Sequence, residues 1–289
     1  MTRREEILSV CDKVVAMPTC VRKASALLDD LDAGIQKLTR IIEYDPGLTA
    51  NLLKVVNASA IARKRPILTA RDALTWLESP EIFRFVISTG VAPTYCRVIA
   101  GYDQAPGMFL QHSTTVAVAS VELAHALGVD APRHTFTAGL LSGVGKLLLG
   151  SFVEVDMRAL LRLVFDENLS FDRAEEAVLG INHAELGGRL LAKWGLPPSI
   201  TNVVRHHLRP DEFDGQDIVL DLVHIGNVLA KMIGVGLGAD GLNYEVSNNV
   251  VARLGITSAA LDTASANVVI EMNSLWDLFL ECADDSCAL

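Results

Sequence analysis

The 289-residue sequence predicts an all-α protein. Apolar residues recur at three- and four-residue spacing in one stretch after another, which is the period of an amphipathic helix. Period-two alternation bounded by turn residues, the pattern of a strand, is nearly absent. The helical stretches are short and have short connections, so we expect a compact multi-helix bundle.

The first hundred residues predict an N-terminal helical subdomain. Asp45 and Pro46 offer an N-cap followed by proline at the first helical position, and they open a helix through LTANLLKVVN. Further capping signals open helices near residues 69 and 79. The Gly- and Pro-containing segment AGYDQAPG predicts an internal boundary, which places the subdomain at residues 1–105.

Residues 106–255 predict a second helical bundle in which three histidines face inward. His112, His183 and His207 each lie on the apolar stripe of a separate predicted helix, and His206 lies about 100° around its helix from His207. Taken singly, each is best interpreted as a core histidine bound to a backbone carbonyl. Because they lie on three helices, we expect them to converge in one buried cavity close to Ser142.

Two glycine-containing segments are not predicted to bind nucleotides. The stretch GLLSGVGKLLL around Lys146 has Leu140 and Leu147 where a phosphate-binding loop needs Gly and Ser or Thr. Residues 236–241 match G-x-G-x-x-G by count, but they follow a predicted helix and not a strand, so we interpret them as a flexible turn.

Carboxylate pairs do not predict an acid–base centre. The adjacent acids at positions 29–30, and likewise Glu175 and Glu176, are interpreted as solvated helix ends. Neither a serine elbow nor a cysteine nucleophile signature is found.

The net charge of −10 argues against nucleic-acid binding, because an acidic chain repels phosphate backbones. The basic run at residues 63–65 precedes a proline and is interpreted as a solvated turn. No apolar run approaches the roughly 18 residues of a membrane span, and the start MTRREEILSV lacks a secretory pattern. The five cysteines show no C-x-x-C spacing and are expected as free thiols. We therefore expect a cytoplasmic protein.

The C-terminal segment, residues 256–289, predicts an acidic amphipathic helix and tail without Lys or Arg. Its apolar residues follow alternating four- and three-residue steps, and three others broaden the stripe. The first set is Val268, Met272, Leu275, Phe279 and Cys282, and the second is Val269, Trp276 and Leu280. We expect this helix to pack on this domain or on a partner protein, and we favour docking within the chain, because an exposed stripe of this width would promote aggregation.

The order of the motifs resembles the HD phosphohydrolase superfamily, and in particular its HDOD branch. H-S-x-x-V-A-x-x-S-x-x-L-A-x-x-L-G is followed by G-L-L-x-x-x-G-K-L, by H-A-E-L-G-x-x-L-L-x-x-W-G-L-P and by R-H-H. Met17-Pro18, IIEYDPGLTANLLKVVNAS and ILTARDALTWL resemble the leading region of that branch. The resemblance covers residues 14–235, and it departs at residues 60–62, where an aromatic-glycine pair is usual.

The resemblance implies a degenerate metal site. Metal-dependent members bind ions through a first His, an adjacent His-Asp pair, further histidines and a later Asp, and the ions activate a water for attack on phosphorus. The positions here are His112, Ser142-Gly143, His183, His206, His207 and Asn227. Both carboxylates are replaced, so we expect a vestigial pocket with no catalytic residue, no metal and no cofactor.

The resemblance implies a regulatory role. HDOD domains are output modules of bacterial signal transduction, and we expect a non-catalytic module that acts through protein–protein interaction. Its partner would be a signalling protein, for example in a receiver-domain or kinase pathway. The sequence itself shows no receiver domain, and neither nucleic acid nor a membrane is expected to take part. The alternative is a residual or altered metal-dependent phosphohydrolase, or a cyclic-nucleotide-binding protein, that uses the remaining histidines.

Overall fold

The structure, a computed structural model, describes residues 1–13, 98–105, 107–132, 134–193, 196, 198–241 and 243–286. Over these residues the chain is helical, with no strand and one isolated bridge between Ile99 and Gln104, so the all-α prediction is confirmed. The chain divides into two compact units, Met1–Val15 with Tyr95–Leu289, and Ala16–Thr94. The helices expected from residue 45 to residue 90 and the basic run at 63–65 lie outside the described residues.

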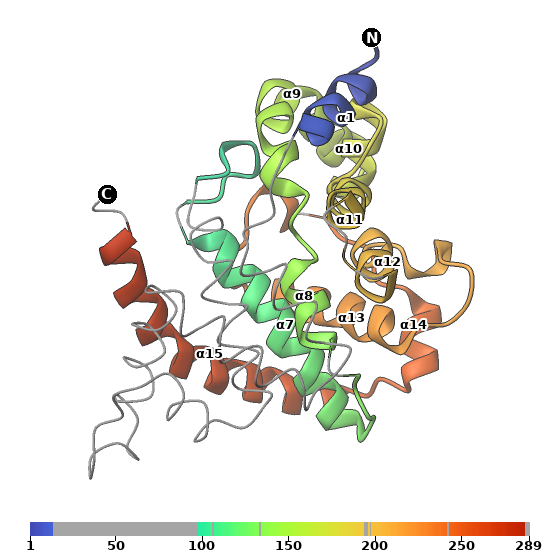
Figure 1. Cartoon of the computed structure of the whole chain (residues 1–289). Helices are drawn as coiled ribbons and strands as arrows, with labels where there is room; N and C mark the ends of the chain where they lie inside the picture. The colour runs from blue at the N-terminus through green and yellow to red at the C-terminus, as the bar shows by residue number, and fades with distance from the viewer. Residues whose placement is uncertain are drawn as a thin grey trace. The chain divides into compact units, whose positions relative to one another are not determined.

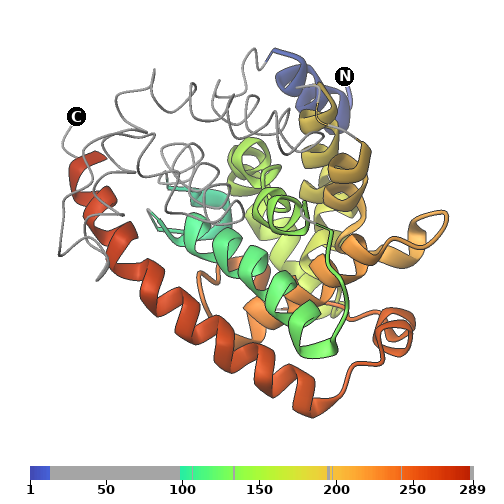
Figure 2. The ribbon, with the colours of Figure 1, turned by 60° about the horizontal axis from the view of Figure 1, so that its bottom comes forward.

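Helix α7 (Met108–Leu127) is the central element of the first unit. Helices α8 (Thr135–Leu141), α13 (Ile218–Ile233) and α15 (Ser258–Ser286) all pack against it (Figures 1 and 2). Residues of α7, α8 and α13, with Val203 of the helix Pro198–His206, form an aliphatic core in which every side chain is nearly inaccessible to water. This core comprises Val116, Ala138, Val203, Val219, Leu220, Val223 and Ala230.

The other side of the unit is built from helices α9 (Lys146–Asp166), α10 (Phe171–Leu179), α11 (His183–Lys193) and α12 (Pro198–His206). Helix α9 contacts α10 and α11, and α12 packs on α11, α8 and α13.

The N-terminal helix α1 (Arg3–Lys13) packs on α9 and α11, two helices that lie much later in the sequence. Arg3 pairs with Asp156 at 2.6 Å, and Arg4 pairs with Glu185 at 2.7 Å. These ion pairs attach the start of the chain to the bundle.

Local sequence signals explain where several helices begin and end. The Asp217 carboxylate accepts the backbone N–H groups of Val219 and Leu220 and so caps α13. Ser247 caps α14 (Asn248–Leu254) in the same way. Gly234 ends α13 with a φ of 84°, a left-handed conformation that glycine adopts without steric cost. Short 3-10 helices lie at Ala100–Tyr102, Pro210–Glu212 and Ala239–Gly241.

The C-terminal segment is one long helix, α15, and its first half docks on α7. Ala264, Val268 and Met272 are buried along one face, and Asn267 donates a hydrogen bond to Glu122 of α7 at 3.0 Å. Val269, expected to widen the buried stripe, is 44% exposed, because it lies off the α7-facing edge. The side chains from residue 274 onward, including Leu275, Trp276, Phe279, Leu280 and Cys282, lie outside the described set.

One described stretch, Thr135–Asp166, has the length and hydropathy of a membrane span. It corresponds to α8 and α9, and 83% of its most apolar window is buried inside the bundle. The core helix of a soluble protein has the same properties.

Candidate functional site

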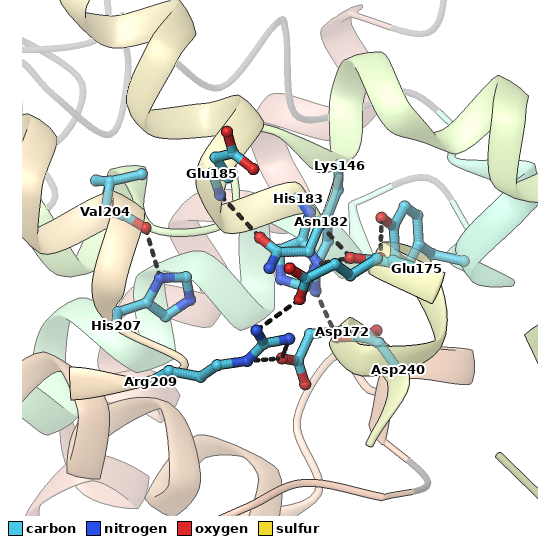
Figure 3. Close-up of polar contacts among 12 residues, drawn as sticks. Lys146, Asp172, Glu175, Asn182, His183, Glu185, Val204, His207, Arg209 and Asp240 are labelled. Atoms are coloured by element: carbon cyan, nitrogen blue, oxygen red, sulfur yellow. Dashed lines mark hydrogen bonds and ion pairs between the residues drawn. The ribbon is translucent and has the colours of Figure 1, made fainter. Parts of the chain in front are cut away.

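Buried polar side chains gather where α7, α9, α10, α11 and α13 meet, and we call this group the polar centre. Figure 3 shows Lys146, Glu175, His183, His207 and Asp240 of this group. All of its members are less than a tenth exposed, which is unusual for charged residues unless they are paired. The polar centre comprises Tyr102, His112, Lys146, Glu175, His183, His207, Asn227, Lys231 and Asp240.

Glu175 of α10 organises one half of the polar centre. Its carboxylate accepts hydrogen bonds from the backbone N–H of His183 at 2.9 Å, from the His183 ring N–H at Nδ1 at 2.8 Å, and from the Tyr102 hydroxyl. The interpretation of Glu175 as a solvated helix end was wrong, because this side chain is 0% exposed. Only its neighbour Glu176 is exposed, and it pairs with Arg209. Glu175 fixes the orientation of His183.

Lys146 of α9 and Asp240 form a buried ion pair in the other half. The ammonium group lies 2.6 Å from Asp240 Oδ2, with the two side chains 3% and 5% exposed. Lys231 of α13 donates to the Asp240 backbone carbonyl at 3.4 Å. The positive charges of Lys146 and Lys231 lower the pKa of Asp240 although burial acts to raise it. Residues 236–241, whose glycines suggested a flexible turn, are held against the bundle in this structure through the contacts of Asp240.

His112 of α7 faces α13 and the segment that follows it. Its Nε2 lies 3.2 Å from Asn227 Oδ1, and its Nδ1 lies 3.3 Å from the carbonyl oxygen of Val235. Burial, together with the positive charge of Lys146, lowers the pKa of His112 to about 4. His112 is accordingly neutral at pH 7, and it links α7 to α13 by polar contacts.

The structure brings most of the expected pocket residues into buried positions. The rings of His183 and His207 lie 6.2 Å apart, and the His207 Nδ1–H donates to the Val204 carbonyl at 2.8 Å. His206 does not join them, because it is half-buried and its ring packs against Phe213. Ser142 is buried, but its hydroxyl donates to the Gly139 carbonyl of its own helix at 2.8 Å.

Gly143 is packed against an aromatic ring. A Cβ atom built on Gly143 would lie 2.9 Å from Cε2 of Phe109, and 3.8 Å from the Ser113 hydroxyl oxygen. The volume that a carboxylate at this position would need is taken by Phe109, which is 0% exposed.

The residues present do not fit the metal ion that the family resemblance implies. Position 143 has no side chain, Asn227 is a neutral amide, and Ser142 bonds to its own helix. Across the described part of the chain, no group of three or more His, Cys, Asp or Glu side chains is placed to hold an ion. Hard divalent cations prefer anionic oxygen ligands, and the nearby Asp240 is already paired with Lys146.

The buried histidines predict that the protein loses stability as the pH falls from 6.5 toward 4. The pKa of His112 is about 4 in the folded chain against 6.5 when exposed, and burial lowers the pKa of His207 well below 6.5. Between these values the unfolded chain binds more protons, so the free energy of unfolding decreases with decreasing pH. His112 alone would contribute about 3 kcal/mol.

Urea unfolding measured at pH 7 and pH 5 tests this dependence. His112→Asn should reduce the pH dependence, because it removes one titrating group while keeping a polar side chain. An unfolding free energy that is the same at both pH values would contradict the prediction.

Sequence analysis did not predict five members of the polar centre: Tyr102, Lys146, Glu175, Lys231 and Asp240. One signal was available for Lys231, which follows Asn227 by four residues and so shares its face of a helix that is otherwise almost entirely apolar. The sequence carried no comparable signal for Asp240, because only the path of the chain after α13 brings this residue to Lys146.

The chain matches a known protein family in sequence and known structures in fold. The HDOD domain family profile matches residues 14–210. A Geobacter sulfurreducens HDOD domain protein of unknown function superposes with a TM-score of 0.69, at 20% identity over 98% of this chain and 97% of that one. A provisionally named signal transduction protein from Marinobacter aquaeolei VT8 gives 0.69, at 18% identity over 99% and 62%.

Two further proteins are similar to this chain. A provisionally named phosphohydrolase from Shewanella amazonensis SB2B gives a TM-score of 0.62, at 18% identity over 96% of this chain and 97% of that one. An uncharacterised protein of Treponema pallidum (strain Nichols) is 20% identical over 77% of this chain. The chain spans only 43% of that curated relative. At these identities the solved structures establish a shared fold.

Proposed function

Because the chain belongs to the HDOD domain family, we propose that it is a non-catalytic regulatory module of bacterial signal transduction that acts by binding a protein partner. The observation that carries this proposal is the packing of Phe109 against Gly143, where the resemblance implies the aspartate of a metal site. Restoring that carboxylate would require the ring to move. In this chain the position is packed against the buried Phe109 ring, which supports a structural and not a catalytic use of the bundle.

The buried charges support the same proposal. Lys146 places a cation inside the polar centre, where it would repel a divalent metal ion, and it neutralises Asp240, the buried carboxylate beside it. The Glu175 carboxylate already accepts hydrogen bonds from Tyr102 and His183, which leaves it less available as a metal ligand. Little anionic charge is left to bind a metal.

The regulatory part of the proposal is supported by the family and by the naming of a relative. The Marinobacter protein of the same fold is provisionally named for signal transduction, and it extends beyond the region matched here. We propose that this chain acts in the bacterial cytoplasm, with a protein of a receiver-domain or kinase pathway as its partner.

The second candidate is a residual or altered metal-dependent phosphohydrolase, or a cyclic-nucleotide-binding protein. It is favoured by the proximity of the buried His183 and His207 rings, since imidazole nitrogens are common ligands of transition metals. The Shewanella protein of the same fold is provisionally named a phosphohydrolase.

Elemental analysis and phosphoesterase assays separate the two candidates. We expect the full chain, incubated with manganese or iron and then dialysed, to retain no stoichiometric metal and to hydrolyse neither phosphomonoesters, phosphodiesters nor cyclic dinucleotides. The matched variant is His183→Ala. One or two metal ions per chain, with turnover that this variant abolishes, would establish the second candidate. The partner is sought by co-purification from the native host, followed by binding with the purified protein.

A further inference from the structure

The segment after α13 lies over the polar centre, and we call residues 235–241 the strap. It begins just after Gly234, which ends α13, and it includes the short helix Ala239–Gly241. Its backbone touches two other elements directly. A Cβ atom on Gly236 would lie 2.4 Å from the carbonyl oxygen of Met108, and one on Gly238 would lie 2.0 Å from that of Tyr102. Any side chain at either glycine would push the strap away.

Side chains of the bundle hold the strap through polar contacts. Gln104 Nε2 donates to the Gly236 carbonyl at 3.0 Å, and His112 Nδ1 lies 3.3 Å from the Val235 carbonyl oxygen. Lys231 Nζ donates to the Asp240 carbonyl at 3.4 Å. Among the described residues, the backbone–backbone hydrogen bond found for the strap runs within it, from the Gly241 N–H to the Gly238 carbonyl at 3.0 Å.

Apolar burial contributes little to this attachment. Val235 and Leu237, the two large apolar residues of the strap, are only partly buried, and its buried residues are Gly236 and Asp240. Segments with few buried apolar contacts open at a lower free energy than the core that surrounds them. Here the strongest single contact is the ion pair of Asp240 with Lys146, at 2.6 Å. Opening would return both charges to water, so part of the lost attraction is recovered as solvation.

We infer that the strap is a cover over the polar centre that opens as a local unit, with the Asp240–Lys146 pair as its lock. While the lock is closed, the strap lies over His112 and engages both buried lysines. When it opens, the ammonium groups of Lys146 and Lys231 and the ring of His112 become accessible, while α7 and α13 remain folded. The strap is thus a two-state element built into the fold, and it operates whether or not the bundle is catalytic.

Hydrogen exchange of the full chain, followed by mass spectrometry, tests the inference. In Asp240→Asn and in Lys146→Met, amides of the strap should exchange about tenfold faster than in the unmodified chain, while the amides of α13 change less. The matched control is Asp221→Asn, which breaks the 2.6 Å ion pair between Asp221 of α13 and Arg253 of α14. This control should leave exchange in the strap unchanged.

A second measurement needs no variant. In the unmodified chain, exchange of the strap at low urea should depend on urea more weakly than exchange of α13, because a local opening exposes less surface than global unfolding. Equal urea dependence for the strap and α13 would overturn the inference. Equal acceleration of the strap and α13 in Asp240→Asn would overturn it as well, since the strap would then open only when the whole unit unfolds.

Discussion

Replacing Glu175 with alanine is expected to lower the free energy of unfolding by about 3–5 kcal/mol, whereas Glu176→Ala should cost no more than about 1 kcal/mol. Glu175 is 0% exposed and accepts hydrogen bonds from the Tyr102 hydroxyl and from the backbone and ring N–H groups of His183. Without it, these buried donors lose their acceptor and each retains its desolvation penalty. Glu176 is exposed, and its ion pair with Arg209 is largely screened by solvent.

Urea unfolding of the two variants, side by side with the unmodified chain, measures the difference. The adjacent positions share a helix and a residue type, so helix propensity cancels in the comparison. Equal losses of stability in the two variants would show that Glu175 is not the buried acceptor that orients His183. Near-equal stability of Glu175→Ala and the unmodified chain would have the same meaning.

A second large loss of stability is expected on substitution of Gly145, where the backbones of the N-terminal end of α9 and of α11 are in contact. A Cβ atom on Gly145 would lie 1.9 Å from the carbonyl oxygen of His183 and 2.7 Å from the backbone nitrogen of Gly187. Because both contacts are with backbone, α11 must shift as a whole to admit a methyl group. Gly145→Ala should therefore cost about 3 kcal/mol or more, above the usual range of overpacking by a methyl group.

Gly107→Ala is the control for this prediction. It distinguishes a steric clash with the backbone from the loss of the conformational freedom of glycine. Gly107 has a φ of 82°, and nothing lies within 4 Å of the position of its Cβ, so alanine there meets backbone strain without a clash. That strain costs about 1–2 kcal/mol. Gly145 has a φ of −64°, which alanine adopts freely. Thermal and urea unfolding should therefore rank Gly145→Ala as the more damaging variant. The reverse order would show that α9 and α11 are not in backbone contact.

The shift of α11 has a further consequence in the polar centre. His183 begins α11, so a displacement of its carbonyl also moves the ring that Glu175 orients. In Gly145→Ala, NMR signals of the His183 and His207 rings should shift, because these rings lie 6.2 Å apart.

The sequence by itself determined the all-α class and the inward faces of several helices. Helical periodicity is a local property, so it placed His112, His183 and His207 on apolar stripes, and all three are buried. The ordered motifs also identified the family, because their spacing extends over most of the chain. The family resemblance, read against the residue types at Gly143 and Asn227, also predicted that both carboxylates of the metal site are replaced.

Only the tertiary structure decided how the buried charges are paired. Glu175 and Glu176 are the same residue type in adjacent positions, and their opposite exposures depend on which side of α10 meets Tyr102 and His183. Asp240 lies 94 residues from Lys146, and no periodicity connects a glycine-rich segment to a helix that far away. The filling of the Gly143 position by Phe109 is equally non-local. Pairing and packing across such separations are set by the path of the chain in space, and that path is not a property of any single stretch of sequence.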